Sequence, residues 1–263
     1  MLKHEVTLFA GVPTMYWGLL NYQDDNFDYT TVSKNLRIAA SGGASLPQKI
    51  LENFESKFKV NLLEGYGMSE GSPVVTFNQL ADGCKPNSIG TPVWGVQVKL
   101  IDEEGAEVKV GEKGELTYKG HNVMKGYYNR PEANAKALKN GWLHSGDIAI
   151  KDKDGFFFIV DRKKDMIIRG GLNVYPREVE EVMMQHPAIS MVAVIGEPDD
   201  KFGEEVKAFV VLKPKESFTT DEIIKWTKEK KAAYKYPRYV EILDALPMST
   251  TGKILKKKLR KEE

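Results

Sequence analysis

The chain has 263 residues, which suits one large or two modest domains, and 41% of them are hydrophobic, enough for ordinary buried cores. Charged residues make up 29% of the sequence, yet the formal net charge is only +1, so we expect no nucleic-acid partner. Cys84 is the only cysteine, which excludes an internal disulfide and indicates a reducing compartment.

Residues 1–86 alternate between strand and helix signals. Residues 6–12 and 36–40 are short apolar runs bounded by Gly or Pro, as in buried strands of a parallel sheet. Residues 60–63 predict a further strand. Between the last two runs, residues 47–58 predict a helix with one apolar face, formed by Ile50, Leu51, Phe54 and Phe58. This region is therefore predicted to be part of an α/β subdomain.

Residues 87–161 change to a period of two. Apolar and polar residues alternate over 96–100, and 115–118 and 148–150 predict further strands. The segment Asp152–Gly155 would join the last of these to a strand at 156–160 as a hairpin. Its two Asp residues also suit a calcium loop, but Phe occupies the later ligand positions, which favours the turn. We predict a small, distorted antiparallel β-barrel.

Residues 162–263 predict a compact α+β domain. Pro176 suits the first position of a helix that stops before His186-Pro187, and Thr219 with Glu222 has the spacing of a capping box. Strands are predicted over 189–195, 206–212 and 239–243.

The basic tail, 253–261, suits either a membrane or nucleic-acid patch or a terminal helix whose cations favour its C-terminal end; we predict the helix. No apolar run approaches the ~20 residues that cross a bilayer, and charges interrupt the N-terminal segment, which makes it a poor signal peptide. We predict a cytoplasmic protein, with a peripheral membrane association left open.

Residues 161–180 crowd charges, a short apolar run, a Gly pair and a Pro-led helix start into one stretch, which indicates a joint between domains. This stretch and four others resemble, in order, the acyl-adenylate-forming superfamily of acyl-CoA synthetases, luciferases and peptide-synthetase adenylation domains. The five segments are 41–45, 66–70, 141–147, 161–171 and 247–253. Residues 9–16, 63–70 and 122–128 are most similar to bacterial long-chain fatty acid–CoA ligases.

The resemblance implies a fold of three parts: residues 1–86 from the large α/β adenylation subdomain, residues 87–161 as the β-barrel subdomain, and residues 162–263 as a mobile lid. It also implies an enzyme that activates a fatty acid with ATP as acyl-AMP and transfers the acyl group to coenzyme A, with Mg²⁺ as cofactor. The lid would swing between the two half-reactions about a hinge at 162–165, with Lys164 as its pivot.

The resemblance also assigns residues to the nucleotide. Gly43, Ala44 and Ser45 would form one wall of the adenine site, although an ordinary turn with Ser45 as a helix cap also fits them. The signature loop would supply the ring of Tyr66, the backbone of Gly67, the Ser69 hydroxyl for the α-phosphate and Glu70 as a magnesium ligand. Most relatives have Thr where Ser69 stands, which keeps the hydroxyl.

Asp147 would accept hydrogen bonds from both ribose hydroxyls, and Arg162 would contact the same ribose. His144 could act as a base, but an ionised carboxylate needs none, so we predict a structural role. Gly171 would lie beside the pantetheine channel, where any side chain would narrow the path of the thiol. Lys253 would bring its ammonium to the carboxylate and α-phosphate; the Gly that begins a P-loop is absent from this segment.

The family's Ser/Thr/Gly-rich phosphate loop, which ends in Lys, is not found in these 263 residues. We therefore expect a truncated chain with negligible ligase turnover, whose exposed sheet edge favours self-association. A nonenzymatic remnant that binds AMP or coenzyme A, or one half of a split enzyme, is the alternative.

Overall fold

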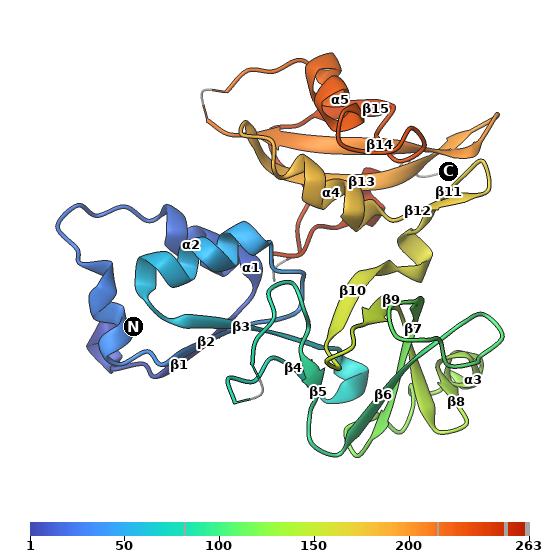
Figure 1. The fold of residues 1–263 in the computed structure, drawn as a ribbon, viewed down its shortest axis with the longest axis horizontal. Helices are drawn as coiled ribbons and strands as arrows, with labels where there is room; N and C mark the ends of the chain where they lie inside the picture. The colour runs from blue at the N-terminus through green and yellow to red at the C-terminus, as the bar shows by residue number, and fades with distance from the viewer. Residues whose placement is uncertain (82, 215, 250–251, 261–263) are drawn as a thin grey trace. The chain divides into compact units, whose positions relative to one another are not determined.

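The computed structural model describes residues 1–81, 83–214, 216–249 and 252–260. The chain divides into two compact units, Met1–Ile159 and Val160–Glu263. The predicted combination of α/β and α+β parts is confirmed, because helices cover a partly parallel sheet near the N-terminus and antiparallel sheets follow (Figure 1). The separation of residues 1–86 from 87–161 stays a prediction.

The first unit begins with a five-stranded sheet in which β1, β2 and β3 run parallel and β4 and β5 antiparallel. The strands are β1 (Leu8–Gly11), β2 (Ile38–Ser41), β3 (Asn61–Gly67), β4 (Val74–Phe77) and β5 (Thr91–Pro92). The helices are α1 (Pro13–Asn21) and α2 (Gln48–Phe58), with short 3-10 segments η1 (Leu2–His4), η2 (Tyr29–Lys34) and η3 (Ser69–Gly71).

Both helices pack on one side of β1, β2 and β3 (Figure 1). The apolar face predicted for α2 is confirmed, since Phe54 and Phe58 are buried and the ring of Tyr16 from α1 meets Phe54 edge-on at 5.1 Å. The Tyr16 hydroxyl donates to the carbonyl of Ala40 at 2.6 Å, which ties α1 to β2. The sequence reasoning did not identify α1.

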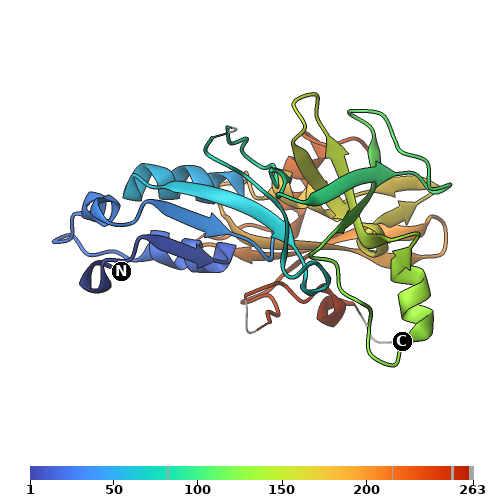
Figure 2. The same ribbon diagram turned by 90° about the horizontal axis from the view of Figure 1, so that it is seen from below.

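The second sheet of this unit is antiparallel, in the order β10-β9-β7-β6 with β8 beside β9. Its elements are β6 (Val96–Ile101), β7 (Lys113–Gly120), α3 (Pro131–Ala137), β8 (Leu138–Lys139), β9 (Trp142–Lys151) and β10 (Phe157–Arg162). The predicted strands of this region are confirmed, and its half-barrel form agrees with the predicted distorted barrel. The helix α3, lime green in Figure 2, was not predicted.

The Asp152–Gly155 segment forms the predicted turn between β9 and β10, and Gly155 has φ +88°. Lys85 forms salt bridges with both Asp152 and Asp154. An ammonium therefore holds the two carboxylates that suggested a calcium loop, which agrees with the turn interpretation.

The second unit contains a five-stranded sheet. The strands β12-β11-β14-β13 are antiparallel neighbours in this order, and β15 runs parallel to β14. Its elements are η4 (Lys163–Asp165), β11 (Ile167–Arg169), β12 (Leu172–Val174), α4 (Pro176–Met183), β13 (Ile189–Asp199), β14 (Gly203–Leu212), α5 (Thr220–Lys228), β15 (Tyr239–Ile242) and η5 (Lys256–Leu259). Val179 and Met183 of α4 and Ile223 of α5 are buried in one core with the sheet. Pro176 is the first residue of α4, as predicted.

The predicted capping box at α5 is confirmed. The Thr219 hydroxyl accepts from the Glu222 N–H at 3.3 Å, and the Glu222 carboxylate accepts from the Thr219 N–H at 2.8 Å. Thr219→Ala should lower the free energy of unfolding by about 1 kcal/mol, because it leaves an N-terminal helix donor without its acceptor. Urea denaturation measures this, with Thr220→Ala as the matched control; equal losses in both variants would contradict the cap.

Within the part of the tail that the structure describes, the predicted terminal helix is present only as the four-residue 3-10 segment η5. Two ion pairs fix this tail instead: Lys256 to Glu180 at 2.6 Å and Arg260 to Asp165 at 3.3 Å. These contacts satisfy basic side chains without a further helical turn; Lys261 lies outside the described residues. No helix in the described ranges is both long and apolar enough to cross a bilayer.

Candidate functional site

The end of β3 lies next to the loop that follows β2. Ser41 pairs in register with Glu64, and a Cβ built on Gly42 would lie 3.5 Å from the carbonyl oxygen of Gly65. The predicted adenine wall, Gly43–Ser45, therefore comes directly after two residues whose main chain lies beside the end of β3, where the signature segment begins.

Tyr66 and Gly67 belong to β3 and do not lie in a loop, because they pair with Thr76 and Val74 of β4. Ser45 does not cap α2: the N-cap residue is Pro47, with no side-chain cap bond.

Tyr66 and Asp147 meet although they are 81 residues apart in sequence. The Tyr66 hydroxyl donates to Asp147 Oδ2 at 2.5 Å, and Asp147 is 6% exposed. Burial, and then the Asp147 carboxylate, raise the pKa of the Tyr66 hydroxyl well above its ordinary value, so it stays a donor. The structure thus joins the residue predicted for adenine to the residue predicted for ribose.

Ser69 and Glu70 form the short helix η3 directly after β3. Ser69 is exposed, and Glu70 accepts a hydrogen bond on Oε1 from the Tyr127 hydroxyl at 2.7 Å. Tyr127 was not predicted as a site residue, although it lies in the segment 122–128 that resembles fatty acid–CoA ligases. The hydrogen bond to Glu70 is the largest cause of the raised pKa of Tyr127.

Tyr118 of β7 is a second tyrosine that the sequence reasoning missed. Its side chain is 0% exposed, and its hydroxyl has no hydrogen-bond partner among the residues that the structure describes. Burial and the nearby Glu70, Tyr127 and Asp147 raise its pKa well above the ordinary value. An orphaned hydroxyl beside two carboxylates fits a site that a polar ligand or an ordered water completes.

His144 of β9 has its Nδ1 3.6 Å from Glu115 Oε1, and both side chains are largely buried. Glu115 also accepts from the N–H of Gly146 at 3.3 Å, in the turn before Asp147. This pairing supports the structural role predicted for His144. Through Glu115, His144 helps to hold the turn that carries Asp147.

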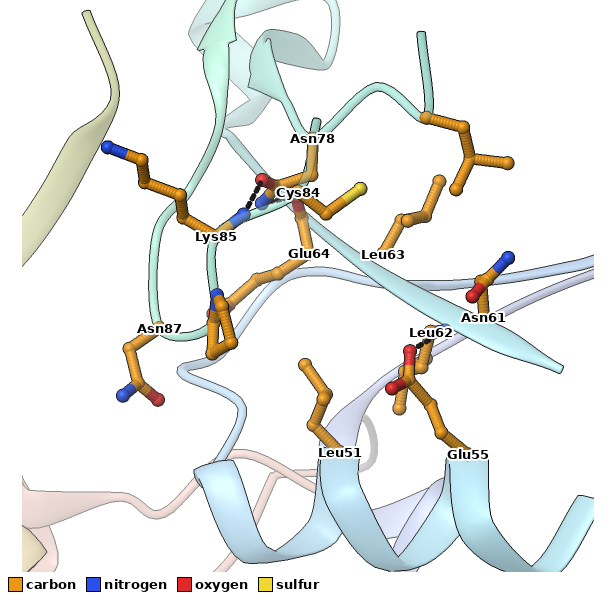
Figure 3. A pocket seen from close by; sticks show the side chains of 12 residues that line it. Leu51, Glu55, Asn61, Leu62, Leu63, Glu64, Asn78, Cys84, Lys85 and Asn87 are labelled. Carbon is orange, nitrogen blue, oxygen red and sulfur yellow. Dashed lines mark hydrogen bonds between the residues drawn. The ribbon is translucent and has the colours of Figure 1, made fainter. Parts of the chain in front are cut away.

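A cavity of about 290 Å³ lies elsewhere in the first unit and contains none of the predicted site residues (Figure 3). Its polar groups serve the backbone: Glu55 accepts from the Leu62 N–H at 2.9 Å, and Asn78 accepts from the Lys85 N–H at 3.2 Å. Burial raises the pKa of the Cys84 thiol at its wall, which disfavours a reactive thiolate. The chemistry therefore favours the Tyr66–Asp147 cluster as the site.

The remaining predicted residues belong to the second unit. Arg162 ends β10, and Lys164 is exposed in η4. The preceding residue, Asp161, accepts from the N–H groups of Arg162 at 2.7 Å and Arg177 at 2.8 Å, which ties the start of this segment to α4. Gly171, with φ +80°, forms a two-residue hairpin turn with Gly170, where glycine is favoured for conformational reasons alone.

Lys253 lies in a tight turn near the C-terminus. The N–H of Ser249 donates to the Lys253 carbonyl at 2.8 Å, and the Lys253 N–H donates to the Ser249 hydroxyl at 3.1 Å. Thr250 and Thr251, which belong to the same predicted motif, lie outside the described residues. The roles that the resemblance gives to Arg162, Lys164, Gly171 and Lys253 stay predictions.

Among the described residues, no group of three or more His, Cys, Asp or Glu side chains could hold a metal ion by itself. A single carboxylate such as Glu70 fits Mg²⁺ only in the mode in which substrate phosphates and waters supply the other ligands. The residues present therefore fit a metal that arrives with a nucleotide.

Known proteins match this chain in sequence and in fold. The profile of the family described as AMP-binding enzyme matches residues 1–128, and that of the AMP-binding enzyme C-terminal domain matches residues 178–253. The chain is 44% identical to a long-chain-fatty-acid–CoA ligase of Bacillus subtilis (strain 168), over 99% of this chain and 46% of the relative. It is 41% identical to a feruloyl-CoA synthase of Amycolatopsis sp, over 98% of this chain and 52% of the relative.

Among solved structures, ATP-bound MatB from Rhodopseudomonas palustris superposes with a TM-score of 0.93 at 33% identity, over 98% of this chain and 51% of that one. The fold is the one found in adenylate-forming enzymes, which include a neighbour solved with an acyl-adenylate intermediate. The chain belongs to the AMP-binding enzyme family. It spans about half the length of the curated relatives that it matches.

Proposed function

We propose that this chain supplies the adenosine-binding part of a long-chain fatty acid–CoA ligase. The whole protein would join a fatty acid to ATP, releasing pyrophosphate and forming acyl-AMP, and would then transfer the acyl group to the thiol of coenzyme A, releasing AMP. The observation that carries this proposal is the 2.5 Å bond between Tyr66 and Asp147, which joins two polar side chains from segments 81 residues apart. The identity of 44% to a long-chain-fatty-acid–CoA ligase supports a fatty acid as the substrate.

Each residue of the cluster has a chemical task in this proposal. Asp147 accepts hydrogen bonds from the ribose hydroxyls through the lone pairs that the Tyr66 hydroxyl does not use. A charged acceptor makes such bonds about twice as strong as neutral ones. Gly43–Ser45 and the ring of Tyr66 flank the adenine, while the Ser69 hydroxyl donates to the α-phosphate. Glu70 would hold Mg²⁺, which when bound neutralises phosphate charge and makes pyrophosphate a better leaving group.

Calorimetric titration of the purified chain tests the proposal. We expect AMP to bind, and 5′-O-(N-palmitoylsulfamoyl)adenosine, a stable mimic of fatty acyl-AMP, to bind more tightly. The feruloyl analogue is the matched control, because a feruloyl-CoA synthase is almost as similar in sequence. Absence of AMP binding would leave an inert fragment, and tighter binding of the feruloyl mimic would replace the fatty acid with an aromatic acid.

We further propose that this chain alone has negligible fatty-acid-dependent ATP–pyrophosphate exchange, since its residues include no Ser/Thr/Gly-rich phosphate loop. Exchange at ordinary enzyme rates would overturn this part of the proposal. The alternative is that this chain is one half of a split enzyme. Exposed apolar side chains on β1 and α1 are consistent with a partner that covers them: Leu8 is 57%, Met15 51% and Trp17 48% exposed.

A further inference from the structure

The segment after β7 braces the turn that carries Glu70. The Asn122 amide donates to the carbonyls of Gly71 at 3.0 Å and Val74 at 2.8 Å, and Asn122 is 8% exposed. The Met124 N–H donates to the carbonyl of Glu70 at 2.8 Å. Three main-chain acceptors around Glu70 are therefore fixed by residues about fifty positions away in sequence.

Tyr127, from the same segment, extends this support to the Glu70 side chain. Its hydroxyl donates to Glu70 Oε1 at 2.7 Å. The main chain of Tyr127 is itself clamped on both sides by Asn134 of α3: the Tyr127 N–H donates to Asn134 Oδ1 at 2.6 Å, and Asn134 Nδ2 donates to the Tyr127 carbonyl at 3.0 Å. The main chain that carries the hydroxyl is thus fixed on both sides.

Resting on the proposed function, we infer that Tyr127 is a positioning residue that fixes the Glu70 carboxylate for a divalent cation bound with ATP. A free glutamate side chain samples several rotamers, and ordering it opposes metal binding. The phenol hydrogen bond occupies Oε1 and leaves Oε2 to bind the cation through one oxygen, the mode expected for Mg²⁺ with substrate phosphates.

The chemistry of a tyrosine suits this task better than that of a cation. A Lys or Arg at this place would neutralise Glu70 and compete with the metal, whereas a phenol orients the carboxylate and leaves its charge intact. Asn134 acts through Tyr127 and should show the same effect in weaker form.

The test compares ATP affinity in EDTA with ATP affinity in saturating Mg²⁺, by calorimetry on the purified chain. In the wild type we expect Mg²⁺ to tighten ATP binding. In Tyr127→Phe we expect that metal-dependent gain to fall by about 10-fold, as for other residues that orient metal ligands, with the affinity in EDTA unchanged. Asn134→Ala should reduce the gain by a smaller factor.

Tyr128→Phe is the matched control, because Tyr128 is the next residue in sequence and is 90% exposed; its gain should equal that of the wild type. A Tyr127→Phe chain that keeps the full gain, or that loses affinity equally with and without Mg²⁺, overturns the positioning role while the nucleotide site stands. A wild-type chain that binds no ATP under either condition overturns the proposed function, and the positioning role with it.

Discussion

Asp147→Asn is expected to weaken AMP binding by about 100-fold. The carboxylate has two oxygens, and Oδ2 already accepts the Tyr66 hydroxyl at 2.5 Å, whereas an Asn side chain has one acceptor oxygen for the same set of donors. Hydrogen bonds to charged groups contribute ~1.5–3 kcal/mol each, and about 3 kcal/mol corresponds to the expected factor. Calorimetric titration with AMP measures the loss.

A ligand that lacks the ribose hydroxyls shows whether Asp147 acts on them. The wild type should bind 2′,3′-dideoxy-AMP far more weakly than AMP, and Asp147→Asn should bind the two almost equally. Asp25→Asn is the matched control for loss of a carboxylate charge, because Asp25 is exposed in the same unit. An Asp147→Asn chain that still prefers AMP by the wild-type factor would show that another group contacts the ribose.

Local sequence signals predicted those parts of the fold that depend on neighbouring residues. The apolar face of α2, the alternation along β6 and the Thr219–Glu222 capping box all follow from spacings of two to four residues, and all are confirmed. The terminal helix is limited to the four residues of η5, and the basic tail is held by ion pairs with Glu180 and Asp165, both distant in sequence.

From the sequence, only those site residues could be predicted that belong to a motif within one short segment. Tyr66, Glu70 and Asp147 stand in recognisable motifs, so the resemblance identified them. Tyr127 reaches Glu70 across 57 residues, and nothing in the local pattern says where its hydroxyl will lie. Tyr118 stands in a run of alternating polar and apolar residues, as expected for any strand with one buried face. Its unsatisfied hydroxyl can be recognised only in the folded structure, where β7 is packed in the core.

Gly67→Ala is expected to lower the free energy of unfolding by about 3 kcal/mol, the upper end of ordinary overpacking. A Cβ at this position would lie 1.7 Å from the Pro73 carbonyl oxygen, 2.7 Å from its carbon and 3.0 Å from the Val74 Cα. All three are main-chain atoms, so no rotamer change can relieve the clash. β3 and β4 must separate where Gly67 pairs with Val74, which displaces Tyr66 and η3 together.

Two other glycines distinguish this steric effect from a general cost of adding a methyl group. Gly18 lies in α1 with no atom within 4 Å of a built Cβ, so Gly18→Ala should stabilise the chain by ~0.5–1 kcal/mol through helix propensity. Gly42→Ala makes an ordinary 3.5 Å contact and should change stability little. Urea denaturation of the three variants gives the order. If Gly67→Ala unfolds at the wild-type urea concentration, β3 and β4 accommodate the added methyl group without cost, and the steric explanation for this glycine is wrong.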